Sequence, residues 1–232
     1  MSVALRIDII TLFPDIFFGP FGVSIVDRAV KAGIVTIRAV DLRDFTHDRH
    51  HTVDDTPYGG GPGMLMKPEP LFEAVRSLKT DESKVILTGP RGRRFDQNAA
   101  SRLASAEKHI IFICGHYEGV DERVRTALAD EEYSIGDYIL TSGNLAAMVM
   151  TDAIVRLLPG ALGDARSGSE ESFGGEGLLE FPQYTRPPVF EDRKVPDILL
   201  RGDHAKIEAW RRAESWNETV RRRPDLIQTE KF

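Results

Sequence analysis

Three segments of the chain combine glycine with residues that could hold a small polar ligand. They are residues 85–92, 113–123 and 133–143, and each joins an apolar or β-prone run to glycine and polar residues. Because glycine has no Cβ, its backbone N–H and C=O groups can approach a ligand closely. Three such loops at neighbouring strand ends would make a crevice lined by backbone, which suits a nucleoside-like cofactor. One such loop alone would be read as a tight turn, so the prediction depends on all three.

Further stretches of the chain extend this pattern. They are the glycine-rich stretch 54–64 and the C-terminal stretches 182–187 (PQYTRP) and 200–204 (LRGDH). Together with the three loops, they resemble motifs of the bacterial tRNA (guanine-N1)-methyltransferase family TrmD, of the SPOUT superfamily. The similar motifs follow the family's order from about residue 7 to residue 223. A set of separated, ordered motifs is far more specific than any one glycine pattern.

The resemblance implies a fold and a division of the chain. The fold is α/β, a parallel sheet flanked by helices with a C-terminal trefoil knot that forms the cofactor pocket, followed by a small helical domain. The expected domains are a knotted cofactor-binding methyltransferase domain at 1–160, a flexible linker at 161–177 and a helical tRNA-binding domain at 178–232. Residues 161–177 contain five glycines, three serines and four acidic residues, a composition typical of linkers.

The resemblance also implies a reaction. A methyl group would pass from S-adenosyl-L-methionine to N1 of the guanine immediately 3′ of the anticodon in tRNA, catalysed by a homodimer. N1 of neutral guanine carries a proton, so the chemistry needs a general base near N1 and a cation or donor near O6, where negative charge grows. Two alternatives stay open, a SPOUT methyltransferase acting on another RNA and a non-catalytic RNA-binding relative.

The catalytic candidates follow from the resemblance. The family's base is an aspartate in an acidic-Asp-Ser-Phe stretch, which here reads Glu170-Glu171-Ser172-Phe173. Alignment on Ser-Phe makes Glu171 the candidate base, one methylene longer than aspartate, with Glu170 as the alternative. Arg156 matches the arginine that the family assigns to O6. Without the family, both glutamates would be read as solvated linker acids.

The resemblance assigns the remaining site residues loop by loop. The substrate-binding candidates are Asp54, Tyr58, Gly59, Gly60 and Gly61. The cofactor-binding candidates are Leu87, Thr88, Gly89, Pro90, Gly115, Tyr117, Glu118, Gly119, Ser134, Ile135, Gly136, Asp137, Tyr138, Ile139, Leu140, Ser142 and Gly143. Two departures adjoin them: His116 stands where the family frequently has arginine, and 141–144 where it commonly has Gly-Gly-Glu.

The order of the expected elements predicts the sheet that must position these loops. Strand-like and helical runs alternate, which favours a parallel sheet flanked by helices. Ser24 is the expected cap of the first helix and Gly33 its stop. A further helix is expected from residue 203 towards Arg222, with Trp210 and Trp216 as core anchors. The expected strands are 6–12, 35–40, 85–87 and 110–113, and the expected helices of the first domain are 24–32, 68–78, 96–106, 121–128 and 144–158.

Composition limits the other classes of protein. The hydrophobic fraction is 41%, and no stretch reaches the roughly 20 apolar residues of a membrane-spanning helix. The N-terminus lacks the pattern of a secretory signal, and the single cysteine, Cys114, is expected as a buried thiol, so we expect a cytoplasmic protein. The formal net charge is −6, but arginines cluster at 91–94 and 221–223, and we expect local basic patches for tRNA.

Metal and nucleotide motifs are absent from the sequence. No dinucleotide-binding G-x-G-x-x-G and no P-loop occurs. His47, His50 and His51 lie in a polar loop without a partner cysteine, so we expect an exposed or RNA-facing cluster and no metal site. Nothing in the sequence indicates that magnesium is required.

Overall fold

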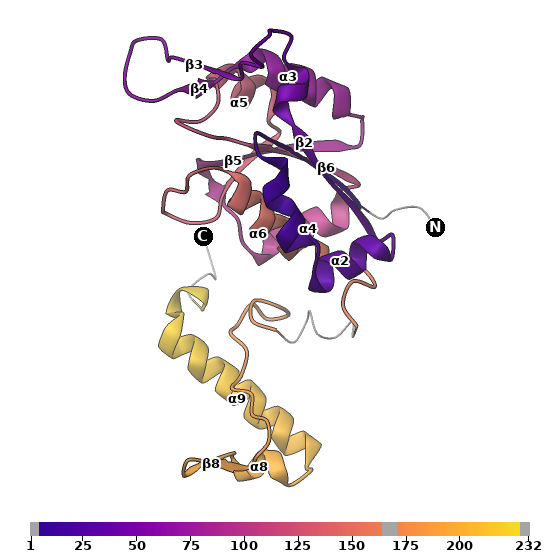
Figure 1. The fold of residues 1–232 in the computed structure, drawn as a ribbon. Coiled ribbons are helices and arrows are strands. Elements are labelled where there is room, and N and C mark those ends of the chain that lie inside the picture. Colours follow the sequence, from indigo (N-terminus) through magenta and orange to yellow (C-terminus); the bar gives the residue numbers. More distant parts are fainter. Residues whose placement is uncertain (1–4, 164–170, 228–232) are drawn as a thin grey trace. The chain divides into compact units, whose positions relative to one another are not determined.

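The fold is that of a computed structural model, in which the structure describes residues 5–163 and 171–227. The chain divides into two compact units, Met1–Gly163 and Asp164–Phe232, which are considered separately (Figure 1). No helix within the two described ranges is long and apolar enough to cross a membrane.

The first unit is built on a five-stranded parallel sheet. Its strands are β1 (Leu5–Thr11), β2 (Val35–Asp41), β5 (Ser83–Arg94), β6 (His109–Cys114) and β7 (Glu131–Ser134), in the order β2-β1-β6-β5-β7. Every pairing is parallel. All six residues of β6 are buried, as expected for a central strand covered on both faces. The predicted α/β class with a parallel sheet is therefore confirmed.

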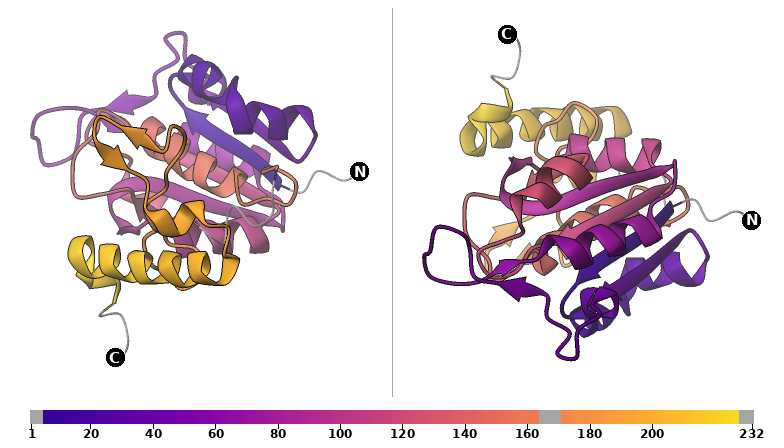
Figure 2. Two further views of the ribbon diagram at one scale, coloured as in Figure 1. Left: turned by 90° about the horizontal axis from the view of Figure 1, so that it is seen from below. Right: turned by 90° about the horizontal axis from the view of Figure 1, so that it is seen from above.

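Helices cover both faces of this sheet (Figure 2). One apolar core gathers residues of α2 (Ser24–Lys31), α4 (Gln97–Ala106) and α6 (Asn144–Val155) against the sheet. A second core gathers residues of α3 (Pro68–Leu78) and α5 (Glu122–Leu128). Asp96 and Asp121 cap α4 and α5 through their carboxylates, which accept from Ala99 N and Arg123 N.

Short elements complete the first unit. The 3₁₀ helix η1 (Pro14–Phe17) runs into α1 (Phe18–Phe21), and η2 (Leu42–Phe45) follows β2. The strands β3 (Asp54–Asp55) and β4 (Leu65–Met66) pair antiparallel at the two ends of the glycine-rich stretch. The stretch 42–63 between β2 and β4 thus contains a 3₁₀ turn and one short strand.

Several predicted boundaries need correction. Ser24 does not cap α2: Val23 is the N-cap residue, and Ser24 is the first residue of the helix, with a φ of 60°. The helix expected at 144–158 ends at Val155. The strand expected at 85–87 continues to Arg94, with a register shift between Thr88 and Arg93, because the glycine- and arginine-rich stretch still pairs with β7.

The second unit is organised around α9 (His204–Arg222), which begins where predicted, with Asp203 as its cap. It also contains α8 (Asp197–Leu200), the 3₁₀ helix η3 (Pro224–Leu226) and an unexpected hairpin of β8 (Val189–Phe190) and β9 (Arg193–Lys194). Backbone pairing across a tight turn formed this hairpin where no strand pattern was evident.

Trp216 is not the core anchor that was expected. Its side chain is 49% exposed in this unit, whereas Trp210 is half-buried. Polar contacts hold the preceding segment on α9 instead. Thr219 Oγ1 accepts from Leu179 N at 2.9 Å, and Ser215 Oγ donates to Leu179 O at 2.5 Å. The small unit is therefore held partly by hydrogen bonds between side chain and backbone.

Candidate functional site

The three glycine loops meet in one pocket of about 590 Å³. Two of them follow β6 and β7, and the first, 85–92, lies within β5 around its register shift, so that all three meet at the same edge of the parallel sheet. All the predicted cofactor residues except Asp137 line this pocket. The structure thus brings together residues from three distant segments, and their binding of a cofactor stays a prediction.

Thr88, Gly115 and Gly143 form the junction between these loops. Gly143 N donates to Gly115 O at 2.7 Å, which joins the loop before α6 to the end of β6. A Cβ atom at position 143 would lie 1.9 Å from Thr88 Oγ1, so glycine is required there by close packing. Thr88 Oγ1 in turn donates to Ile113 O at 3.1 Å. The junction holds the backbones of all three segments within direct contact.

The loop after β7 folds back on itself. Ser134 Oγ donates to Gly136 O at 3.0 Å, and Tyr138 N donates to the same oxygen at 3.0 Å. The ring of Tyr138 lies against Gly136, where a Cβ would come within 2.3 Å of the ring. These contacts shape the wall formed by 134–140.

The loop after β6 is tightly bent. Tyr117 has a φ of 56°, an uncommon conformation for a residue with a side chain, and Gly119 N donates to His116 O at 2.9 Å. The rings of His116 and Tyr117 meet edge to face, with centroids 4.4 Å apart. Residues with strained backbone conformations cluster at active sites and ligand-binding sites, where the surrounding structure holds them in place.

Charged groups line one side of the pocket. Glu132 lies 3.4 Å from Arg125 and beside the backbone of Gly89. Burial raises the pKa of the Glu132 carboxyl, the charge of Arg91 opposes that rise, and the nearby Glu122 adds to it. Cys114, behind the pocket, is buried as predicted, and burial raises the pKa of its thiol well above the usual range. The thiol therefore stays protonated and is a poor nucleophile at neutral pH.

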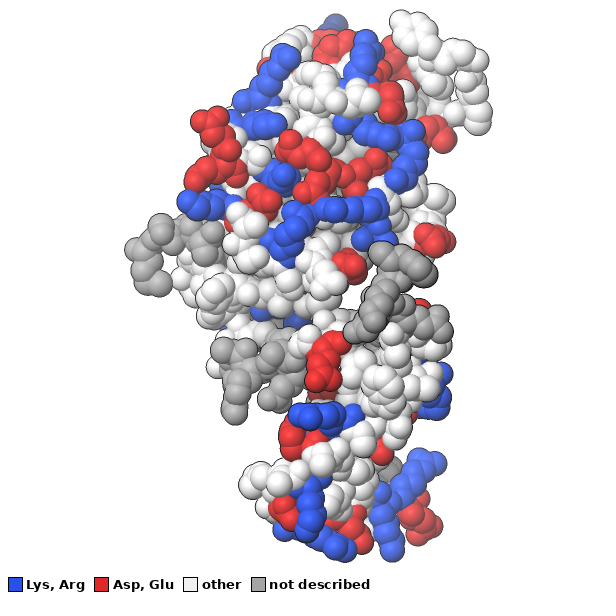
Figure 3. Space-filling model, turned by 180° about the vertical axis from the view of Figure 1, so that it is seen from behind, with Lys and Arg blue, Asp and Glu red and all other residues white. Residues whose placement is uncertain are grey.

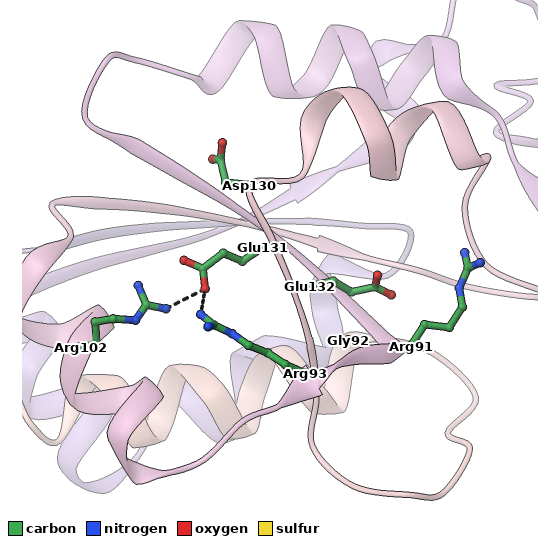
Figure 4. A pocket seen from close by; sticks show the side chains of 7 residues that line it. All are labelled: Arg91, Gly92, Arg93, Arg102, Asp130, Glu131 and Glu132. Carbon is green, nitrogen blue, oxygen red and sulfur yellow. Dashed lines mark hydrogen bonds and ion pairs between the residues drawn. The ribbon is translucent and has the colours of Figure 1, made fainter. Parts of the chain in front are cut away.

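A second hollow of about 610 Å³ adjoins the first and is lined by charged residues (Figure 4). Glu131 lies between Arg93 and Arg102 and accepts from Arg102 at 2.7 Å. Burial raises the pKa of Glu131, but hydrogen bonds from Tyr133 and Arg102 outweigh burial, so the net pKa is lowered. The charges of this hollow therefore largely neutralise one another.

The predicted basic patches are mixed in charge. Arg91 pairs with Glu122 at 3.0 Å, and Arg221 and Arg222 both pair with Glu218. Arg223 pairs with Asp225 at 2.7 Å. Figure 3 shows side chains of both signs interspersed on the face that it draws. The arginines cluster in sequence, but neighbouring carboxylates reduce the local positive potential.

The predicted substrate residues lie on the segment between β3 and β4. Asp54 belongs to β3, and Tyr58 is fully exposed. Gly59, Gly60 and Gly61 all have a positive φ. None of these five residues lines the pocket, although Leu65, at the end of the same segment, does.

The two catalytic candidates belong to different units. Arg156 directly follows α6 as its C-cap residue, and its N–H donates to Asp152 O at 3.1 Å. Glu171 is in the second unit, where its backbone oxygen accepts from Gly174 N at 3.0 Å and the residue is one of those that line a cavity of about 210 Å³ beside α9. Glu170 lies outside the described residues.

Two of the three clustered histidines, His47 and His51, contact neighbouring polar side chains. His47 Nε2 lies 2.8 Å from Glu73 Oε2, and the Thr46 hydroxyl lies 2.9 Å from His51 Nδ1. Within 5–163 and 171–227, no group of three or more His, Cys, Asp or Glu side chains could hold a metal ion.

Some residues that line the pocket were not among the predicted ones. Most adjoin predicted positions, so wider loop boundaries would have found them. Leu65 gave no local signal, because only tertiary pairing brings its strand to the pocket. The additional lining residues are Leu65, Arg91, His116, Val120, Glu122, Glu132, Tyr133, Thr141 and Ala146.

Comparisons with known proteins agree with one another. The family model described as tRNA (Guanine-1)-methyltransferase TrmD matches residues 5–229. A tRNA (guanine-N(1)-)-methyltransferase of Dictyoglomus turgidum is 58% identical over 224 residues, covering 97% of this chain and 90% of that protein. The proteins of the same description from Carboxydothermus hydrogenoformans and Staphylococcus haemolyticus are 53% and 54% identical, covering 96% of this chain and 87% and 91% of their own lengths.

Proposed function

Since this chain belongs to the tRNA (guanine-1)-methyltransferase TrmD family, we propose that its substrate is the guanine immediately 3′ of the anticodon in tRNA. The activity is that of the family: a methyl group passes from S-adenosyl-L-methionine to N1 of a guanine in tRNA. The match to the family over residues 5–229 is the observation that carries this function.

The pocket of the first unit fits the methyl donor. Its volume of about 590 Å³ is within the roughly 300–1,000 Å³ typical of ligand pockets. At Gly115 a Cβ would meet no atom closer than 3.8 Å, so that glycine leaves open space beside the backbone. Backbone groups of 87–92, 115–119 and 134–140 would hold the nucleoside. The bound donor supplies a methyl group on a positively charged sulfur.

Two residues of the chain carry the proposed chemistry. Glu171 removes the proton from N1 of the guanine, and Arg156 stabilises the negative charge that grows on O6. N1, freed of its proton, would be the nucleophile for the methyl group that bound S-adenosyl-L-methionine would supply, with the sulfur as the leaving group that keeps the bonding electron pair. The proton stays on Glu171 until solvent takes it. The rest of the catalysis is alignment of N1 with the methyl group.

The finer features of the family are also proposed for this chain. The three loops of the pocket would form the trefoil knot, with 1–160 as the methyltransferase domain, 161–177 as a flexible linker and 178–232 as the tRNA-binding domain. The working enzyme would be a homodimer in the cytoplasm. The exposed apolar side chains of Leu145 and Val149 on α6 support a surface for a second copy.

A methyl-transfer assay on unmodified tRNA transcripts tests the function. Labelled methyl groups should appear on N1 of the guanine 3′ of the anticodon, and a transcript with adenine at that position should stay unmethylated. If only a different RNA is methylated, the protein is a SPOUT methyltransferase with another RNA substrate. If the protein binds RNA without cofactor and methylates none, it is a non-catalytic RNA-binding relative.

The role of Glu171 is tested in the same assay. Glu171→Gln should lower the single-turnover rate by about 10²–10⁴-fold, as loss of a general base does, and leave cofactor affinity unchanged. Glu171→Asp should keep much more activity, because it restores the family's usual carboxylate. The matched control is Glu170→Gln, which should methylate at close to the wild-type rate. If the two glutamine variants behave in the opposite way, Glu170 is the base.

A further inference from the structure

The end of the glycine-rich segment pairs with the loop that follows β6. Glu118 N donates to Met64 O at 3.1 Å, and Met66 N donates to Gly119 O at 3.0 Å. Asp121 N then donates to Met66 O at 3.0 Å. These bonds form a short parallel ladder that continues the pairing of β4. The C-terminal end of the segment 57–63 is therefore anchored, through Met64 and Met66, to a wall of the pocket.

One side chain reinforces this anchor. The side chain of Glu118 lies against the backbone of Gly63, where a Cβ would come within 2.3 Å of Glu118 Oε1 and 2.5 Å of Glu118 Cγ. No side chain fits at position 63 while Glu118 keeps this place. Glu118 also lines the pocket. A single residue thus lines the pocket and lies with its side chain against the glycine-rich segment.

The rest of the segment has a different environment. At Gly59, Gly60 and Gly61, a Cβ would meet no atom within 4 Å. Tyr58 is fully exposed. The stretch that was predicted to contact tRNA is therefore open, and the closely packed contact lies at its Gly63 end.

We infer that Glu118 is a positioning residue that couples the cofactor pocket to the glycine-rich segment 57–63. The inference rests on the proposed function, because it takes the pocket as the cofactor site and the segment as a tRNA site. A ligand that holds the Glu118 side chain in place also holds the backbone at Gly63. A cofactor that favours one position of the segment therefore changes the affinity of the protein for tRNA. By thermodynamic linkage, bound tRNA changes the affinity of the protein for the cofactor by the same factor.

A double-mutant cycle tests this contact. Gly63→Ala should weaken binding of S-adenosyl-L-methionine at least about threefold in calorimetry, because the new methyl group displaces Glu118, and contacting residues typically couple by this much or more. In a Glu118→Ala background, the same change at position 63 should cause no further loss. The matched control is Gly33→Ala, since φ is +70° at Gly33 and +83° at Gly63, so alanine is similarly strained at both, and a Cβ at Gly33 would meet no atom within 4 Å. Gly33→Ala should leave cofactor affinity unchanged.

Hydrogen exchange gives a second measurement that works without cofactor. In the free protein, Gly63→Ala should speed amide exchange of residues 64–66, and this effect should disappear in Glu118→Ala. In the wild type, saturating cofactor should slow exchange at 58–66, and Glu118→Ala should lose that response even where it still binds cofactor.

The outcomes separate two failures. Equal losses from Gly63→Ala with and without the Glu118 side chain would overturn the coupling, and so would an equal loss from Gly33→Ala. Absence of cofactor binding by the wild type would overturn the proposed function itself.

Discussion

The carboxylate of Asp8 is fully buried in β1 and is surrounded by groups that favour its charged form. Its oxygens lie 2.8 Å from Arg38 Nε, 2.9 Å from His109 Nε2 and 2.6 Å from a terminal nitrogen of Arg6. Burial alone would raise the pKa of Asp8, but the hydrogen bonds from His109 and Arg38, helped by the charges of Arg38 and Arg6, outweigh it. The net pKa is therefore below 3.8, its ordinary value.

A lowered pKa makes a prediction about stability and pH. The ionised carboxylate stabilises the fold above the unfolded-state pKa, and this contribution is lost as pH falls through the folded-state pKa. Asp8→Asn should lower the free energy of unfolding at pH 7 by about 1–3 kcal/mol, because hydrogen bonds to a buried carboxylate are lost while the two arginines left behind are partly exposed. The difference from the wild type should shrink as pH falls below about 4.

Urea unfolding of both proteins between pH 3 and pH 7 measures this difference. The matched control is Asp27→Asn, because Asp27 pairs with an exposed lysine, Lys31, at 2.7 Å. That change should cost less than about 1 kcal/mol at pH 7. If the difference in free energy of unfolding between the wild type and Asp8→Asn stays constant from pH 3 to pH 7, the lowered pKa of Asp8 is contradicted.

At the scale of elements, the pocket depends on the junction of strand ends with the start of α6. Gly143 has φ −72° and ψ −4°, which any residue can adopt. Glycine is therefore needed at position 143 because of the space around it and not because of its backbone conformation. A methyl group there would meet Thr88 Oγ1 and would also lie 3.1 Å from Cys114 Cα. Because Thr88 and Cys114 belong to β5 and β6, a change at position 143 acts on both strands.

Gly143→Ala should therefore destabilise the protein by about 1–3 kcal/mol, the usual cost of overpacking. Thermal unfolding measures the effect. Adding Thr88→Ala should recover part of the loss, since it removes the atom that the methyl group meets. The matched control is Gly19→Ala, where a Cβ would meet no atom within 4 Å. No recovery in the double variant would show that Thr88 is not the obstacle.

At the scale of the whole molecule, the proposed homodimer is the feature that extends beyond one chain. Leu145 and Val149 lie four residues apart on α6, and each is about half exposed. Val149→Glu should therefore give a monomer in sedimentation and abolish methylation. The matched control is Val30→Glu, an exposed position on α2, which should stay dimeric. A fully active monomer would contradict the dimer.

Mixing two inactive variants tests whether the site spans both chains. Gly115→Val should fill the pocket without a backbone clash, because a Cβ there meets atoms only at 3.8–3.9 Å. Co-expression of this variant with Glu171→Gln should restore activity in heterodimers that contain one complete site. Each variant alone should remain inactive. If the mixture is inactive as well, each chain holds its own complete site, and the shared site is contradicted.

Local sequence predicted the elements that are driven by local physics. The strand expected at 110–113 and the helices expected at 68–78, 96–106 and 121–128 lie close to where they were predicted, because burial and capping act over a few residues. The structure adds that Asp96 and Asp121 are caps and not the first helical residues. The register shift in β5 was missed, since its pairing with β7 is a contact between distant residues. The exposure of Trp216 was missed for a similar reason, because composition does not say which neighbours cover a side chain.

For the site, the sequence by itself determined the three loops, and their motifs determined the family. Only the tertiary structure decided what surrounds them. It brought Leu65 to the pocket, set Glu118 against Gly63, and paired the clustered arginines with Glu122 and Glu218. A glycine motif is a local requirement of the backbone and is visible in the sequence. Contacts between segments far apart in the chain depend on the order of the strands and on packing, which no local pattern encodes.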